Sequence, residues 1–243
     1  GGQPPGDIDS VLILVRKLLD FASSSQQELI ELSLCKEFDE VHYQSLNLLN
    51  VCIIALHIGI ALKYETDDLI HVGVAALLHD VGIITYLETI SQPRPLHEEE
   101  FVKVKQHPQE GRALLEKSGY KLMLNVLAGV EQEHERMDAS GYPQGLPGEQ
   151  IHHFARLIGF ADVYEALIHR RPWRAAMTPL QAMKLILHSK TAFDSVMIKT
   201  FLDNVGLCPR GTLIELNTKE LAQVVRHNVK YPMAPCINII SDA

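Results

Sequence analysis

The sequence predicts an all-α multi-helix bundle that carries a small β appendage at its C-terminus. Apolar residues recur at helical spacing from residue 7 to about residue 205, and polar or Gly/Pro-containing loops interrupt them. The last part of the chain instead shows short apolar runs separated by Asn, Gly and Pro, a pattern typical of strands. A length of 243 residues, 47% of them hydrophobic, is enough to bury a sizeable core in one large domain.

The chain is expected to divide into three segments. Residues 1–38 are predicted to form an N-terminal linker and helices, residues 39–205 the main helical domain, and residues 206–243 a small β element of the same domain. The sequence GGQPPG at residues 1–6 is typical of a linker. A second helix of the first segment is expected over 26–36, after a stripe formed by Ile8, Val11, Leu12, Val15, Leu18 and Leu19.

Two helix starts in the main domain carry a capping signal. Thr66 is expected to cap a helix whose first turn contains two acids. Thr178 is followed by Pro179 and by Gln181 three residues on, which predicts a capping box with Pro at the first helical position. The helices of this domain are expected over residues 39–63, 67–79, 97–117, 121–136, 151–168, 179–189 and 195–205.

Three breaks in the helical pattern are predicted. Residues 87–96 contain two prolines and are expected to form a loop, which could cover a site because it follows a candidate ligand pair closely. Pro108 is expected to kink its helix just after His107. Residues 138–148 form a Gly/Pro loop. In the tail, strands are expected over residues 211–216, 221–226 and 237–240.

Composition excludes several classes of protein. A formal net charge of -8 argues against a face that binds duplex nucleic acid through its phosphates. The longest apolar run, residues 51–62, is shorter than the roughly 18 to 20 residues that cross a membrane, so no membrane span and a cytoplasmic location are expected. No C-x-x-C pair is present, which favours reduced core thiols over a disulfide frame or zinc knuckle for Cys35, Cys52, Cys208 and Cys236.

A set of histidines and acids predicts a metal centre built by several helices. His79 and Asp80 are adjacent in LLHDVG and place an imidazole and a carboxylate at one helix end. The carboxylate of Asp80 can share its two oxygens between neighbouring cations, an arrangement that suits phosphoester hydrolysis. A single histidine on a helix is more often a capped or surface residue, and the histidines outside this set are assigned to that class. The set continues with His107, Glu133, His134 and Asp162.

The order and spacing of these motifs resemble the HD-GYP family of metal phosphohydrolases, bacterial signal transduction proteins associated with cyclic di-GMP. The resemblance spans residues 43 to 243. It implies an HD-type bundle in which a metal-activated water hydrolyses a cyclic dinucleotide phosphodiester. The motifs that carry it are LLHDVG, QHP, EHERMDASGYP, ARLIGFADVYEAL, HRRPW and GTLIEL.

The resemblance also implies how the ions are held. One ion would bind His79, Asp80 and Asp162, and a second would bind Asp80, His107 and His134. His79 and Asp80 are the predicted catalytic residues. One or two ions of Fe, Mn, Mg or Zn are expected, and two ions about 3.5 to 4 Å apart would lower the pKa of a bridging water. The full set of predicted ligands is His79, Asp80, His107, Glu133, His134 and Asp162.

Several positions depart from the family pattern. Asn47 stands where the family has its first ligand His, and Tyr43 where some members carry an additional Glu, so a third metal is not expected. Glu133 replaces a His and favours harder cations such as Mn or Mg. Ile83 replaces a Lys that would meet substrate phosphate, although core packing is the simpler interpretation of its side chain. Ala139 replaces a Gly and would be strained at positive φ.

Basic side chains near these motifs are candidates for binding substrate, because Arg binds phosphate through two parallel hydrogen bonds. An alternative for Arg156 is a structural ion pair with Asp138 or Asp162. The run at residues 170–174 is either a cationic rim with a stacking aromatic or a solvated turn. The predicted substrate-binding residues are Arg136, Asp138, Arg156 and Arg171.

Two functions from different classes follow. The first is a cyclic di-GMP phosphodiesterase whose activity is impaired by the substitutions; a phosphohydrolase that acts on a related nucleotide is a variant of it. The second is a catalytically degenerate signalling module that acts through protein–protein contacts. By the resemblance, Gly141, Tyr142 and Pro143 would contact GGDEF-type cyclase domains, and a homodimer is compatible with either function.

Overall fold

Helix α2 (Tyr43–Ala61) lies at the centre of a bundle of helices in the computed structural model of the chain. Residues 51–59 are all buried, because α2 packs against α1 (Ile8–Ser33), α3 (Thr66–Leu78) and α8 (His153–Ile168). A helix that is apolar all round belongs in the core of such a bundle. The structure describes residues 8–34, 43–171, 174–226, 228, 230–231 and 234–241.

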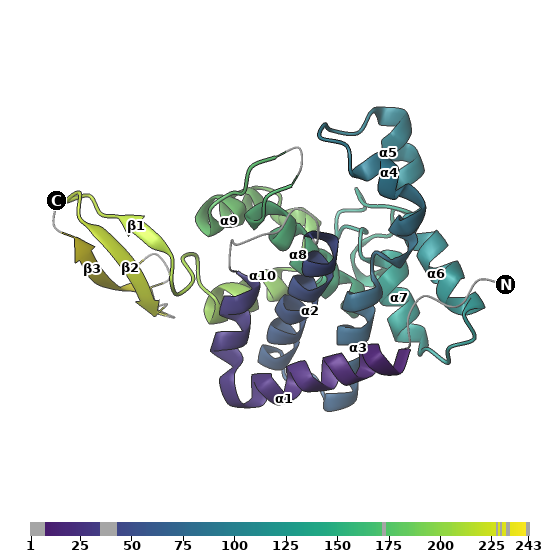
Figure 1. Cartoon of the computed structure of the whole chain (residues 1–243), viewed down its shortest axis with the longest axis horizontal. Coiled ribbons are helices and arrows are strands. Elements are labelled where there is room, and N and C mark those ends of the chain that lie inside the picture. The colour runs from purple at the N-terminus through teal and green to yellow at the C-terminus, as the bar shows by residue number, and fades with distance from the viewer. Residues whose placement is uncertain are drawn as a thin grey trace.

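The remaining helices surround this centre (Figure 1). A small apolar cluster of Leu115, Leu127 and Val130 holds α6 against α7, at the side of the bundle where most of the candidate ligands lie. The elements are η2 (Val81–Tyr86), α4 (Leu87–Ile90), α5 (Glu98–Val104), α6 (His107–Lys117), α7 (Leu124–Gln132), η3 (Gly148–Gln150), α9 (Pro179–His188), η4 (Lys190–Ala192) and α10 (Ser195–Asn204).

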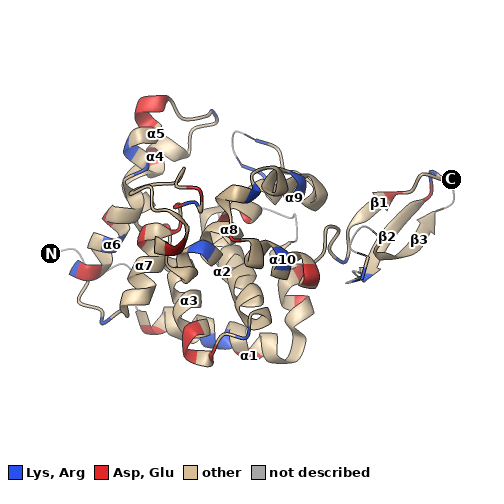
Figure 2. Cartoon of the chain, turned by 180° about the vertical axis from the view of Figure 1, so that it is seen from behind, with Lys and Arg blue, Asp and Glu red and all other residues tan. Residues whose placement is uncertain are grey.

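A three-stranded antiparallel sheet projects beyond α10 (Figure 1). Its order is β1 (Leu213–Glu215), β2 (Leu221–Arg226), β3 (Cys236–Ser241), with register shifts between β2 and β3. The predicted all-α multi-helix bundle with a small C-terminal β appendage is therefore confirmed. Figure 2 shows basic and acidic residues interspersed along the helices, whereas the strands carry few of either.

Several element boundaries differ from the predictions. The two helices expected within residues 1–38 are joined in α1 across one non-helical residue, Ser25. The boundary predicted between residues 38 and 39 lies outside the described residues. Thr66 is the first helical residue of α3 rather than its cap; the N-cap is Glu65, which makes no side-chain capping bond to any described residue. The capping box at Thr178 is confirmed, with the backbone N–H of Gln181 donating to Thr178 Oγ1.

The predictions for the segment between α3 and α6 were wrong in two respects. Residues 87–96 are not entirely loop, because α4 forms one helical turn at their start. Pro108 does not kink a continuous helix. The chain instead breaks between α5 and α6, and Pro108 lies in the first turn of α6, where its missing N–H leaves no helical bond unmade.

Two segments are long and apolar enough to cross a membrane by length and composition, Tyr43–Ala61 and Thr66–Ile90. The sequence prediction considered only residues 51–62 and missed both. Within the bundle 61% of the first window and 44% of the second are buried. Packing in the core accounts for such hydropathy in α2 and α3, so the two segments are weak evidence for a span.

Candidate metal centre

The candidate ligands lie at helix ends that close glycine contacts bring together. His79 follows α3 and Asp80 precedes η2, while His107 opens α6. A Cβ at Gly82 would collide with the carbonyl oxygen of His107, and one at Gly159 on α8 would collide with that of Glu133. Glycine at these two positions therefore lets the backbones approach closely enough for the ligands to meet.

Two histidines are oriented by the backbone. Nδ1 of His79 lies 2.7 Å from the carbonyl oxygen of Ala76, and Nδ1 of His107 lies 2.7 Å from that of Val104. Each Nδ1–H donates to its carbonyl, which leaves Nε2 with a free lone pair. Fixing a metal-binding imidazole by a hydrogen bond from its other nitrogen is the usual arrangement in metal sites.

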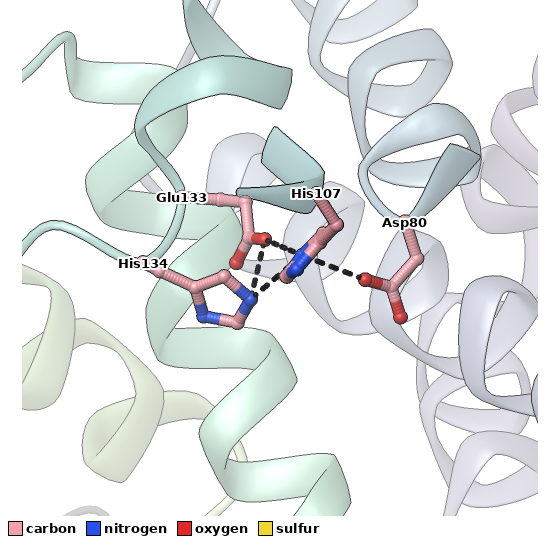
Figure 3. A group of neighbouring side chains, drawn as sticks. All are labelled: Asp80, His107, Glu133 and His134. Atoms are coloured by element: carbon pink, nitrogen blue, oxygen red, sulfur yellow. Dashed lines mark hydrogen bonds and ion pairs between the residues drawn. The ribbon is translucent and has the colours of Figure 1, made fainter. Parts of the chain in front are cut away.

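Four side chains converge on a space the size of a cation (Figure 3). One ligand atom from each lies within 4.8 Å of the others. His107 Nε2 is 3.2 Å from Asp80 Oδ1 and 3.2 Å from His134 Nε2, which in turn is 2.8 Å from Glu133 Oε1. We call Asp80, His107, Glu133 and His134 the second group, because they include the ligands predicted for the second ion.

The first group consists of His79, Asp80 and Asp162, the ligands predicted for the first ion. Asp80 belongs to both groups. His79 Nε2 lies 3.7 Å from Asp80 Oδ2 and 3.9 Å from Asp162 Oδ1. The structure therefore brings all six predicted ligands close together, in the two sets that the resemblance implied, with Glu133 added to the second set. Their role as ligands stays a prediction.

Buried polar atoms in both groups fit a cation. His79 Nε2 and both carboxylate oxygens of Glu133 are buried and have no hydrogen-bond partner among the described residues, although Glu133 Oε1 lies within ion-pair distance of His134. Leaving such atoms unsatisfied is costly, and a bound cation would satisfy them. Imidazole and carboxylate ligands suit Fe, Mn or Zn, and carboxylates also suit Mg.

The charges of the two groups are coupled. Burial lowers the pKa of His107, but the close approach and negative charge of Asp80 and Glu133 outweigh burial and raise that pKa to about 10. Burial would raise the pKa of Asp80 and of Glu133, yet the nearby histidines bring both below their usual values. Burial raises the pKa of Asp162. Without a metal, protonated histidines therefore balance the negative charge of the carboxylates. A bound cation would take over that role.

Asn47, at the position of the missing ligand His, is turned toward acids. It is buried, and its Nδ2 donates to Glu165 Oε2 at 2.6 Å and, more weakly, to Asp162 Oδ1 at 3.4 Å. The amide thus serves as a neutral donor between two carboxylates. The first group has three strong ligands, and Asn47 holds one of them in place.

Glu165 is a site residue that sequence reasoning missed. It is fully buried and also accepts from Asn50 at 3.3 Å, while His169 Nδ1 lies 3.0 Å away and Arg171 Nη2 donates at 2.8 Å. It therefore links the first group to a basic side chain. Its spacing of three residues from Asp162 on one helix was the available signal, since such residues share a helix face.

A cavity of about 840 Å³ opens over both groups. This size lies within the range of roughly 300 to 1,000 Å³ that is usual for small-molecule sites. Ile83 forms part of the wall, together with Ile90 and Leu96 from the segment predicted to cover a site. The basic residues that line the cavity are Arg94, Arg136, Arg171 and Arg174.

The predicted substrate-binding residues separate into two pairs. Arg136 and Arg171 line this cavity, whereas Asp138 and Arg156 are not part of its described lining. Arg156 pairs with Asp194 at 3.3 Å and with Glu149 at 3.3 Å, so its expected partners were wrong. Asp138 accepts hydrogen bonds from Ser140 and Thr191. The placement of Asp138 and Arg156 gives no support to a substrate role.

The loop that contains Gly141, Tyr142 and Pro143 supports the second group. The Tyr142 ring stacks on His134 with centroids 4.6 Å apart, and its backbone N–H donates to the carbonyl oxygen of His134 at 3.2 Å. Ala139 has a φ of 61°, which is the positive φ at which strain was expected for an alanine. Contact of this loop with a partner stays a prediction.

The question about residues 170–174 has a partial answer. Arg171 and Arg174 line the cavity, and Arg174 also donates to backbone carbonyls of α8, at 3.2 Å to that of Leu167. Pro172 and Trp173 lie outside the described residues. The two arginines therefore form a cationic rim, and the aromatic part of that prediction stays untested.

Known proteins are similar to this chain in sequence. The family model described as HD domain matches residues 21–196. A cyclic di-GMP phosphodiesterase of Pseudomonas aeruginosa is 31% identical over 220 residues, which cover 88% of this chain and 51% of that protein. A 3'3'-cGAMP-specific phosphodiesterase of Vibrio cholerae is 35% identical over 113 residues, which cover 46% of this chain and 26% of that protein. The chain thus spans about half the length of the first relative.

A solved structure shares the fold. The HDG"Y"P protein of Bdellovibrio bacteriovorus matches with a TM-score of 0.63 at 20% identity, covering 80% of this chain and 61% of that chain. At this identity the likeness concerns the arrangement of the helices and not the chemistry of the site.

Proposed function

The chain belongs to the HD-GYP family of HD domains, and on that basis we propose that it is a metal-dependent phosphodiesterase that hydrolyses a cyclic dinucleotide. The observation that carries the proposal is the sharing of Asp80 between two groups of ligands at the floor of one cavity. Ligands shared in this way are suited to hold ions on both sides of a phosphorus centre.

Cyclic di-GMP is the proposed substrate. One relative is named for cyclic di-GMP and another for 3'3'-cGAMP, and both compounds are cyclic dinucleotides with two phosphodiester groups. The cavity volume suits a ligand of that class, and its basic rim faces the phosphates of such a ligand.

The residues of the chain have separate roles in this proposal. Bound metal would supply Lewis acidity and lower the pKa of a coordinated water. Asp80 is placed to hold both ions, and Glu165 keeps Arg171 extended toward the cavity for a phosphate oxygen. Tyr142 keeps the His134 ring in position by stacking. Glu133 makes Mn or Mg the favoured metal of the second group.

Reduced activity is part of the proposal. Asn47 adds no imidazole to the first group, and Ile83 offers no charge to a phosphate. These two features also favour the alternative, a catalytically degenerate module that uses the loop at residues 141–143 to bind GGDEF-type cyclase domains. A cytoplasmic location and a homodimer remain predictions for either function.

The two functions are separated by one experiment. Protein purified without chelators is analysed for metal, then loaded with Mn, Fe, Mg or Zn and incubated with cyclic di-GMP and with 3'3'-cGAMP. We expect linear or fully hydrolysed dinucleotide with at least one metal. Protein that binds metal in no condition, or binds it and cleaves neither compound, would support the degenerate module instead.

A further inference from the structure

A smaller cavity of about 450 Å³ adjoins the one over the metal centre. Phe101, His134, Arg136 and Tyr142 line both cavities, so the two form neighbouring compartments of one depression. The proposed chemistry at the metal centre uses only the larger compartment. A cyclic dinucleotide has two nucleotide halves, and only one of its phosphates reacts at a time.

The smaller compartment contains a cation held by aromatic rings. Lys105 Nζ lies 4.7 Å from the centroid of the Phe101 ring and 5.4 Å from that of Tyr142. In the part of the chain that the structure describes, Lys105 forms no ion pair with a carboxylate. A lysine held only by ring faces has its hydrogen-bond donors available for an anion, and a charge-assisted bond to phosphate is stronger than a contact with a ring.

The same rings offer a surface for a base. Phe101 is 43% exposed and meets Tyr142 edge to face, with centroids 6.3 Å apart. Phe193 and Ile186 also line this compartment. An exposed aromatic ring in a compartment with apolar lining suits stacking of a purine, because every base offers a flat face to a ring.

Ile83 leaves its part of the larger cavity wall without a charge. Its aliphatic side chain lines the larger cavity and cannot neutralise a phosphate there. The Tyr142 ring contacts both Lys105 and His134. Lys105 is therefore placed to meet a phosphate in the smaller compartment, next to the metal centre.

We propose that Phe101, Lys105 and Tyr142 form a subsite for the nucleotide half that is not being cleaved. Lys105 binds the second phosphate, and Phe101 stacks on the attached purine. This inference rests on the proposed function, because it assumes a cyclic dinucleotide in the larger cavity. It makes Lys105 a specificity-determining residue for cyclic dinucleotides over simple phosphodiesters.

The test compares two substrates on three variants. Lys105→Met and Phe101→Leu are assayed with cyclic di-GMP and with bis(p-nitrophenyl) phosphate, a diester without a second nucleotide half. Lys103→Met, a change at an exposed lysine of α5, is the matched control. We expect KM for cyclic di-GMP to rise about tenfold in Lys105→Met, the loss of one charge-assisted bond, and severalfold in Phe101→Leu. Cleavage of bis(p-nitrophenyl) phosphate should fall much less than cleavage of cyclic di-GMP in Lys105→Met and Phe101→Leu, and cleavage of both substrates should stay unchanged in Lys103→Met.

Binding of a fluorescent cyclic di-GMP to metal-loaded protein gives a second readout that needs no turnover. Wild type that binds the probe, with equal affinity in Lys105→Met and Phe101→Leu, would overturn the subsite and leave the proposed function standing. Wild type that neither binds nor cleaves a cyclic dinucleotide would overturn both. An equal loss of activity on both substrates in Lys105→Met would show that Lys105 acts on the metal centre and not on a second nucleotide.

A double variant sharpens the result. Lys105 lines the smaller compartment and position 83 the larger cavity, so Lys105→Met should raise KM by about the same factor in an Ile83→Lys background as in wild type. A smaller rise in the Ile83→Lys background would show that the two positions bind the same phosphate, and the assignment of Lys105 to the second phosphate would be wrong.

Discussion

The two groups of the metal centre differ in how completely the chain supplies ligands. The second group has four ligand side chains within 4.8 Å, two of them imidazoles. The first group has only three, and the fourth position is the amide of Asn47, which donates to acids. The two groups share Asp80, but only the first includes a position where the resemblance implies a missing ligand. The comparison teaches that the substitution at Asn47 leaves the four side chains of the second group within reach of one another.

The largest effect is expected from Asp80→Asn, because Asp80 belongs to both groups. Cleavage of cyclic di-GMP should fall about 10²- to 10⁴-fold, the several kcal/mol that metal ions contribute to such reactions. The measurement is the initial rate with Mn at saturating substrate, and Asp67→Asn in the first turn of α3 is the control. Retention of wild-type rates would remove Asp80 from the reacting site.

Metal binding should stabilise the fold mainly through the second group. At a hundredfold excess of Mn over its Kd, the gain is about 2.7 kcal/mol, which corresponds to a rise in Tm of roughly 5 to 10 °C. His134→Ala should abolish most of this rise and His79→Ala less of it, as measured by thermal unfolding with and without Mn. Equal losses in the two variants would mean that the groups bind metal equally well.

Asn47→His tests whether the first group can be completed. An imidazole at this position should increase bound Mn from about one ion per chain to about two, measured by elemental analysis after gel filtration. Asn47→Ala, which removes the amide and adds no ligand, is the control and should not increase bound metal. If the His variant binds no additional ion, the first group is limited by something other than its ligand count.

The smallest effect is expected from Ile83→Lys, which changes the cavity wall and neither group of ligands. A lysine there should lower KM for cyclic di-GMP about tenfold, the gain of one charge-assisted hydrogen bond, and should leave metal content unchanged. Ile84→Lys is the matched control, since Ile84 is 61% exposed and is not in the described lining of the cavity. Equal kinetics of the two variants would favour a packing role for Ile83.

Residue order was enough to predict the helical bundle, the strands of the tail and six residues that meet in space. Each helix or strand buries one face, so its apolar residues recur at a regular spacing. That spacing is visible in a short segment of sequence. The ligands were recognisable because histidine and acid pairs, such as His79 with Asp80, stand next to each other. Among the predictions that needed only neighbours in the chain, the capping box at Thr178 was confirmed, whereas the cap at Thr66 and the kink at Pro108 were wrong.

Other contacts between elements that are distant in the sequence could not be predicted. Arg156 could have paired with any of several acids, and the packing of α8 against the start of α10 selected Asp194. The network around Glu165 and the ring contacts of Lys105 depend on distances of a few ångströms between helices that are remote in the chain. Hydrogen bonds and ion pairs weaken steeply when the two groups move a few ångströms apart. Which partners meet is therefore set by tertiary packing and not by spacing along the chain.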